Sequence, residues 1–99
     1  MMPFHPAAGQ TVNIDVASSS ANIQVTSGSG MSQVRVMNNG TATAWIRFGV
    51  DNTVAATTAA GIPVGPGVTE VMSHQNPLWV AAIAAGSTGK IYFTPGEGI

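Results

Sequence analysis

The chain has 99 residues, of which 44% are hydrophobic, only seven are charged and none is cysteine, with a formal net charge of −1. A chain of this length supports one modest core, which excludes a second domain and a deep, water-excluded active site. The three Lys and Arg residues are scattered singly, which excludes a phosphate-tracking nucleic-acid surface and binding to an anionic membrane surface. The lack of cysteine excludes disulfides, a thiolate nucleophile and a cysteine-ligated metal.

The N-terminal residues 1–9 contain two prolines and no hydrophobic periodicity, so we interpret them as an extended arm that packs on a neighbour, with disorder at Phe4 and His5 as the alternative. They lack the basic and apolar regions of a secretory signal. The longest apolar run, Leu78 to Ala85, is much shorter than the roughly 20 residues that cross a bilayer. We therefore expect a soluble protein with an arm at 1–9 and one domain at 10–99.

The composition favours strands over helices. Val and Ile number eighteen against a single Leu, and β-branched residues are typical of half-buried pleated surfaces. Gly, Pro and Asn fall mostly between the stretches rich in Val and Ile, where turns are expected. An all-β fold is predicted.

Alternating hydrophobic residues predict four strands in the first half of the chain, at 10–17, 22–26, 32–37 and 42–50. The dipeptide Asn39-Gly40 between the last two is a strong hairpin signal, because both residues tolerate positive φ. The side chains predicted to face inward are Val12, Ile14, Val16, Ile23, Val25, Val34, Val36, Ala44, Ile46, Phe48 and Val50.

The second half begins with an ambiguous stretch, in which a short edge strand at 53–56 followed by a loop is favoured over a weak helical turn at 55–60. Residues 61–67 are too rich in Pro and Gly to be regular. Strands are then predicted at 68–73, 78–84 and 88–94. The second of these is expected to be buried on both faces, with a short buried helix as the alternative.

About eight short strands joined by turns indicate an antiparallel β-sandwich. A jelly-roll-like arrangement is preferred and an immunoglobulin-like sandwich is the alternative, because one sequence does not reveal the order of pairing.

The sequence contains no pattern typical of a catalytic or metal-binding site. Residues 86–90, Gly-Ser-Thr-Gly-Lys, are similar to part of a phosphate-binding loop, but the leading Gly and the Ser or Thr after the Lys are missing. The segment also lies between two predicted strands, so a turn is expected. The two histidines, His5 and His74, have no ligand at metal-binding spacing. We expect no enzyme activity, no metal and no cofactor.

The outward side of the predicted strands carries Arg, Met and aromatic side chains, which are enriched in protein interfaces. The alternative to an interface role for Trp45 and Tyr92 is that their side chains cover loops or fill the edge of the core. Trp79, in a strand that is apolar on both faces, is either core or interface. The predicted contact residues are Phe4, His5, Arg35, Met37, Trp45, Arg47 and Tyr92.

Three segments, Val34–Gly49, Ala59–Val64 and Ile91–Ile99, resemble small structural proteins of tailed bacteriophages. The resemblance implies a capsid decoration or cement protein, made in the bacterial cytoplasm, that sits on the virion surface and locks neighbouring capsomers. Its implied partners are the major capsid protein and further copies of itself, as a dimer or trimer, with no nucleic acid or membrane. A glycan-binding sandwich and a tail or head-completion component are the alternatives.

Overall fold

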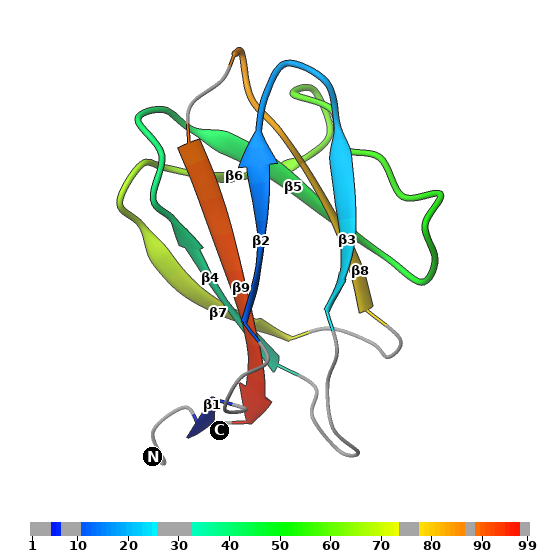
Figure 1. Ribbon diagram of the computed structural model, residues 1–99, viewed down its shortest axis with the longest axis vertical. Helices are drawn as coiled ribbons and strands as arrows, with labels where there is room; N and C mark the ends of the chain where they lie inside the picture. The colour runs from blue at the N-terminus through cyan, green and yellow to red at the C-terminus, as the bar shows by residue number, and fades with distance from the viewer. Residues whose placement is uncertain (1–4, 7–10, 26–32, 74–77, 87–88, 98–99) are drawn as a thin grey trace.

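The computed structural model describes residues 5–6, 11–25, 33–73, 78–86 and 89–97, and there the chain forms two facing antiparallel β-sheets (Figure 1). In these ranges no helix is long and apolar enough to span a membrane. The strands are β1 (His5–Pro6), β2 (Val12–Val16), β3 (Ala21–Val25), β4 (Gln33–Asn38), β5 (Ala44–Gly49), β6 (Ile62–Val64), β7 (Thr69–Ser73), β8 (Leu78–Ile83) and β9 (Gly89–Glu97).

Sheet A has the order β9-β4-β7, with β1 and β2 pairing the same side of β9, and sheet B has the order β3-β8-β5-β6. The pairs are nested along the chain, since β2 pairs with β9, β3 with β8, β4 with β7 and β5 with β6. A long antiparallel ribbon folded over in this way is the pattern of a jelly roll. The predicted all-β sandwich of jelly-roll type is confirmed.

The core lies between the two sheets and is made by the inward phase of each strand. Because side chains alternate across a strand, every second residue of β2, β4, β5, β8 and β9 reaches it. Of the side chains predicted to face inward, Val50 alone is wrong, because β5 ends at Gly49 and Val50 is 58% exposed. The core cluster comprises Ile14, Val16, Val25, Val34, Val36, Ala44, Ile46, Val64, Leu78, Val80, Ala82, Ala84, Ile91 and Phe93.

The predicted hairpin at Asn39-Gly40 is wrong, because β4 belongs to sheet A and β5 to sheet B. The connection crosses between the sheets, and neither residue of the dipeptide has a positive φ. The fully buried Asn38 holds this crossing. Its Nδ2 donates to the carbonyls of Ala42 and Val64, each at 2.9 Å, and its Oδ1 accepts from the Gly40 amide at 2.9 Å.

Two further expectations for the middle of the chain are corrected. The strand predicted at 53–56 is absent, and residues 50–61 form a loop that contains turns. Conversely, β6 lies inside the 61–67 segment that was expected to be irregular, and it pairs with β5. Pro63 is tolerated there because β6 is an edge strand of sheet B.

The segment at 78–84 is a strand and not a helix, as predicted, and Ala81 in its outward phase is as fully buried as Val80 in its inward phase. Something outside the two-sheet core therefore covers the outer side of sheet B.

Candidate functional site

The outer face of sheet A, which we call the open face, is formed by the outward side chains of β2, β9, β4 and β7. Tyr92 on β9 lies opposite Asn13 on β2 and opposite Met37 on β4. Arg35, two residues before Met37, lies opposite Val71 on β7. Three of the predicted contact residues, Arg35, Met37 and Tyr92, are thereby brought together on adjacent strands.

A shallow concavity of about 380 Å³ lies in the middle of the open face. Two threonine hydroxyls from strands far apart in sequence, Thr11 and Thr94, are linked there by a hydrogen bond of 2.9 Å. The concavity combines a half-buried phenol ring, a thioether, a guanidinium group and several hydroxyl and amide groups. It is lined by Thr11, Arg35, Met37, Asn39, Tyr92 and Thr94.

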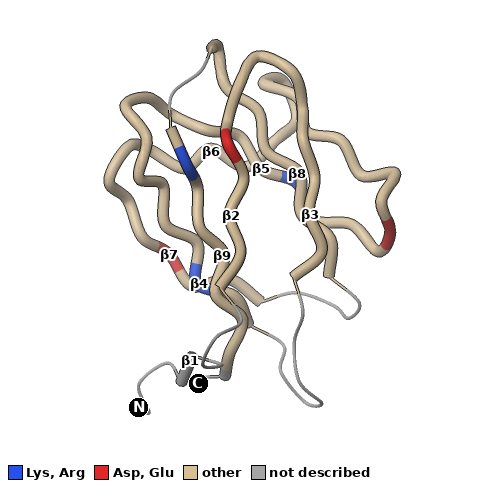
Figure 2. Tube along the Cα trace, in the orientation of Figure 1, with Lys and Arg blue, Asp and Glu red and all other residues tan. Residues whose placement is uncertain are grey.

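The charges of the open face are few, and Figure 2 shows charged residues scattered thinly over the fold. At one end Lys90 Nζ donates to Asp15 Oδ1 at 2.6 Å. This hydrogen bond, helped by the Coulombic attraction of Asp15, raises the pKa of Lys90. Both side chains are well exposed, so the ion pair adds little to stability. The pair sets two opposite charges together outside the concavity, and Arg35 is the charged residue among those that line it.

The outer face of sheet B, which we call the covered face, differs because the loop 50–61 lies across it. Asn22 on β3 donates through Nδ2 to the carbonyls of Asn52 and Val54, at 2.9 and 3.1 Å. The amide of Ala56 donates to Ser20 Oγ at 2.9 Å, and Ala56 is almost fully buried. These contacts hold the loop against sheet B at its β3 side.

Small residues make room for the loop on the covered face. A Cβ on Gly49 would lie 2.6 Å from the Cβ of Val54, and a Cβ on Gly61 would lie 2.7 Å from that of Trp45. Both distances are shorter than real contacts allow, so the loop packs directly on backbone. Ala81, in the same outward phase of sheet B as Gly49, is fully buried.

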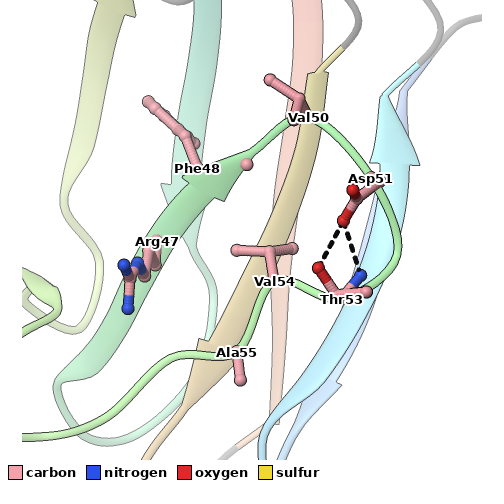
Figure 3. A pocket seen from close by; sticks show the side chains of 8 residues that line it. Arg47, Phe48, Val50, Asp51, Thr53, Val54 and Ala55 are labelled. Atoms are coloured by element: carbon pink, nitrogen blue, oxygen red, sulfur yellow. Dashed lines mark hydrogen bonds between the residues drawn. The ribbon is translucent and has the colours of Figure 1, made fainter.

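A hollow of about 350 Å³ remains between β5 and the loop, with Arg47 and Asp51 at opposite ends (Figure 3). Asp51 Oδ1 accepts hydrogen bonds from the amide and the hydroxyl of Thr53. These bonds lower the pKa of Asp51. The Asp51 carboxylate therefore stabilises the turn at the start of the loop. We interpret the hollow as the gap left where the loop leaves β5, and not as a binding site.

The predicted contact residues do not form one surface. Trp45 and Arg47 lie on β5 in the covered face, on the opposite side of the sandwich from Arg35 and Tyr92. Trp79, whose neighbours Leu78 and Val80 face the core, lies in the outward phase of β8 and is half-buried.

Of the predicted arm, the structure describes His5 and Pro6, which form β1 at the edge of sheet A. His5 pairs through its backbone with Glu97 at the end of β9. Phe4 and His74 lie outside the described residues.

Thr11, Asn39, Val71 and Thr94 belong to the open face but are not among the contact residues predicted from the sequence. Val71 had a usable signal, because it lies in the phase opposite to Met72, which packs against the core. No comparable signal exists for Thr11 and Asn39, which lie just outside strands and reach the concavity only through the sheet geometry.

Within the described ranges, no three His, Asp or Glu residues gather closely enough to hold a metal ion. Comparison of the chain with protein-family models, with curated proteins and with solved structures finds no match. The open face, with its aromatic, thioether and guanidinium groups around a shallow concavity, is the candidate functional site.

Proposed function

We propose that the protein is a non-enzymatic structural protein of a bacteriophage particle, which binds the outer surface of the capsid and cements neighbouring capsomers. The observation that carries the proposal is the open face. It presents Arg35, Met37 and Tyr92 on the adjacent strands β4 and β9, with Tyr92 directly opposite Met37. Residues of these types dominate the energetics of protein interfaces. The resemblance of three segments to small phage structural proteins supplies the kind of partner.

The physics of cementing suits such a surface. A protein that binds the assembled lattice but not free capsid subunits stabilises the shell by mass action. Repetition over many equivalent sites converts a modest affinity at each site into strong retention. Contacts made by apolar and aromatic groups also change little when the salt concentration varies, whereas exposed ion pairs are screened.

The test adds the purified protein to expanded heads that lack it. We expect saturable binding and an increased resistance of the heads to heat. Tyr92→Ala should weaken binding about tenfold, since losing a central aromatic anchor typically costs more than 1 kcal/mol. Arg47→Ala, on the covered face, is the matched control and should bind like the unaltered protein. Heads that neither bind the protein nor gain heat resistance would refute the proposal.

The copy number in purified virions separates cement from a tail or head-completion component. Cement predicts copies in proportion to the capsomers, whereas a tail component predicts a small fixed number for each particle.

A glycan-binding role is the second candidate, favoured by the concavity itself. A half-buried Tyr92 ring beside the polar groups of Arg35, Asn39 and Thr94 is an arrangement on which sugars stack and form hydrogen bonds. A glycan array probed with the protein distinguishes the two roles. Binding to a defined glycan that is lost in Tyr92→Ala would favour this candidate, and no response on the array is expected for cement.

A further inference from the structure

The edge strands of the two sheets differ in how well they are protected against pairing. At one edge of sheet B, β6 has three residues and includes Pro63, a combination that discourages strand addition. At the β7 edge of sheet A, opposite the edge formed by β1 and β2, β7 has five residues without proline, and all of them except Met72 are exposed. Among the described strands, only β4 pairs with β7. Within the part of the chain that the structure describes, one long side of β7 is therefore available to another strand.

The direction of the free backbone groups follows from the β4–β7 ladder. The amide of Asn38 donates to the carbonyl of Val68 at 3.0 Å, and the register continues with Val36 opposite Glu70 and Val34 opposite Met72. In an antiparallel pair, alternate residues point their N–H and C=O groups toward the partner. The even-numbered residues of β7 therefore face β4. Thr69, Val71 and Ser73 direct their backbone groups away from it.

We propose that β7 pairs antiparallel with β7 of a second copy of this chain, about a twofold axis at Val71. In this register Val71 lies opposite Val71 of the second copy, and Thr69 lies opposite Ser73. All three residues with outward backbone groups are then matched, and their pairs are the hydrogen-bonded ones. The two A sheets become one continuous sheet, and the two open faces lie side by side.

Other registers also pair the outward backbone groups of the two β7 strands. The charge of Glu70 and the length of β7 favour the proposed one. A shift that centres the axis on Glu70 would place two carboxylates directly opposite each other, which is destabilising. A shift that centres it on Met72 would leave Thr69 without a partner in β7. The proposed register instead sets Glu70 opposite Met72. It also brings together two copies of the Val71 side chain, which is 47% exposed in one copy.

This self-complementarity is the reason to choose a second copy over a segment of another protein. Dimerisation is a property of the isolated chain and does not depend on the capsid proposal. A protein that dimerises through β7 but fails to bind heads would refute the proposed function alone.

The first experiment measures mass by sedimentation equilibrium over a concentration series. Val71→Lys places two like charges at the axis, and we expect it to abolish the dimer. Ile62→Lys on β6 is the matched control, because Ile62 is 43% exposed on the edge of the other sheet. It should leave the dimer unchanged. A monomer for the unaltered protein up to about 1 mM would overturn the proposal, since this excludes all but the weakest association. A dimer that Ile62→Lys disrupts and Val71→Lys does not would overturn it as well.

The second experiment introduces single cysteines, which are the only ones in each variant because the chain itself has none. It does not depend on Val71→Lys, so its result stands even if that variant is unstable. Hydrogen-bonded pairs in an antiparallel ladder have Cα atoms about 5.5 Å apart, within the range of a disulfide. Val71→Cys should therefore cross-link to itself on oxidation. Thr69→Cys should cross-link to Ser73→Cys but not to itself, because two copies of Thr69 would lie on the order of 14 Å apart along the strands. A dimer without these cross-links, or β7 pairing found only on heads, would refute the proposal.

Discussion

The two outer faces of the sandwich arise from strands with the same alternation, yet only one of them is open. On sheet A the outward phase carries bulky groups such as Met37 and Tyr92, and the concavity between them is exposed. On sheet B the outward phase includes Gly49 and the fully buried Ala81, and Val54 of the loop 50–61 packs directly onto Gly49. The lack of a side chain at Gly49 thus leaves room for the loop beside the larger outward residues Trp45 and Trp79.

The same difference explains where the aromatic residues lie. Trp45 and Trp79 are half-buried on the covered face, and the backbone at Gly61 packs against Trp45. Tyr92 lines the concavity of the open face. An aromatic residue in the outward phase of a strand is therefore a weak indicator of an interface unless the loops that follow are also known.

The largest effect is expected at Asn38, which joins the two sheets beneath both faces. Asn38→Ala would leave the carbonyls of Ala42 and Val64 without their side-chain donor in a buried site. We expect a loss of about 3 kcal/mol in the free energy of unfolding, measured by urea denaturation. The neighbouring exposed Asn39→Ala is the control and should change stability by less than about 0.5 kcal/mol. Equal losses for the two variants would contradict the role of Asn38.

A smaller effect, confined to the covered face, is expected from Gly49→Ala. The added Cβ would overlap the side chain of Val54, so the loop must shift from sheet B. We expect a loss of about 2 kcal/mol in stability together with stronger acrylamide quenching of tryptophan fluorescence. Gly86→Ala is the control, because a Cβ there meets nothing within 4 Å. Unchanged quenching in Gly49→Ala would mean that the loop does not shield the tryptophans.

The smallest loss of stability is expected for Asn22 on the covered face, with Asn13 on the open face as its control. Asn22→Ala removes two hydrogen bonds to the loop, and we expect a loss of about 1 kcal/mol in stability with increased tryptophan quenching. Asn13→Ala on the open face removes only a 3.4 Å contact with Lys90 and should change stability by less than about 0.5 kcal/mol. If both variants lose the same stability, the hydrogen bonds of Asn22 do not hold the loop.

Part of this structure could be predicted because it depends on local alternation alone. The inward side chains of β2, β4 and β9 follow from a period of two that any pleated strand imposes. The Asn39-Gly40 prediction failed because local turn preference competes with tertiary bonds, and the buried amide of Asn38 satisfies three backbone groups only when the chain crosses between sheets. The strand at 53–56 failed because its residues pack onto Gly49 and sheet B as a loop.

The sequence by itself determined the fold class, the inward phase of most strands and the scarcity of charge, because these depend on residue type and on spacing between neighbours. Only the tertiary structure decided which predicted contact residues share a surface. Arg35, Met37 and Tyr92 meet because β4 and β9, far apart in the chain, are neighbours in sheet A. Trp45 and Arg47 are separated from them because the connection at Asn38 sends β5 into sheet B, where a loop covers what the strand turns outward.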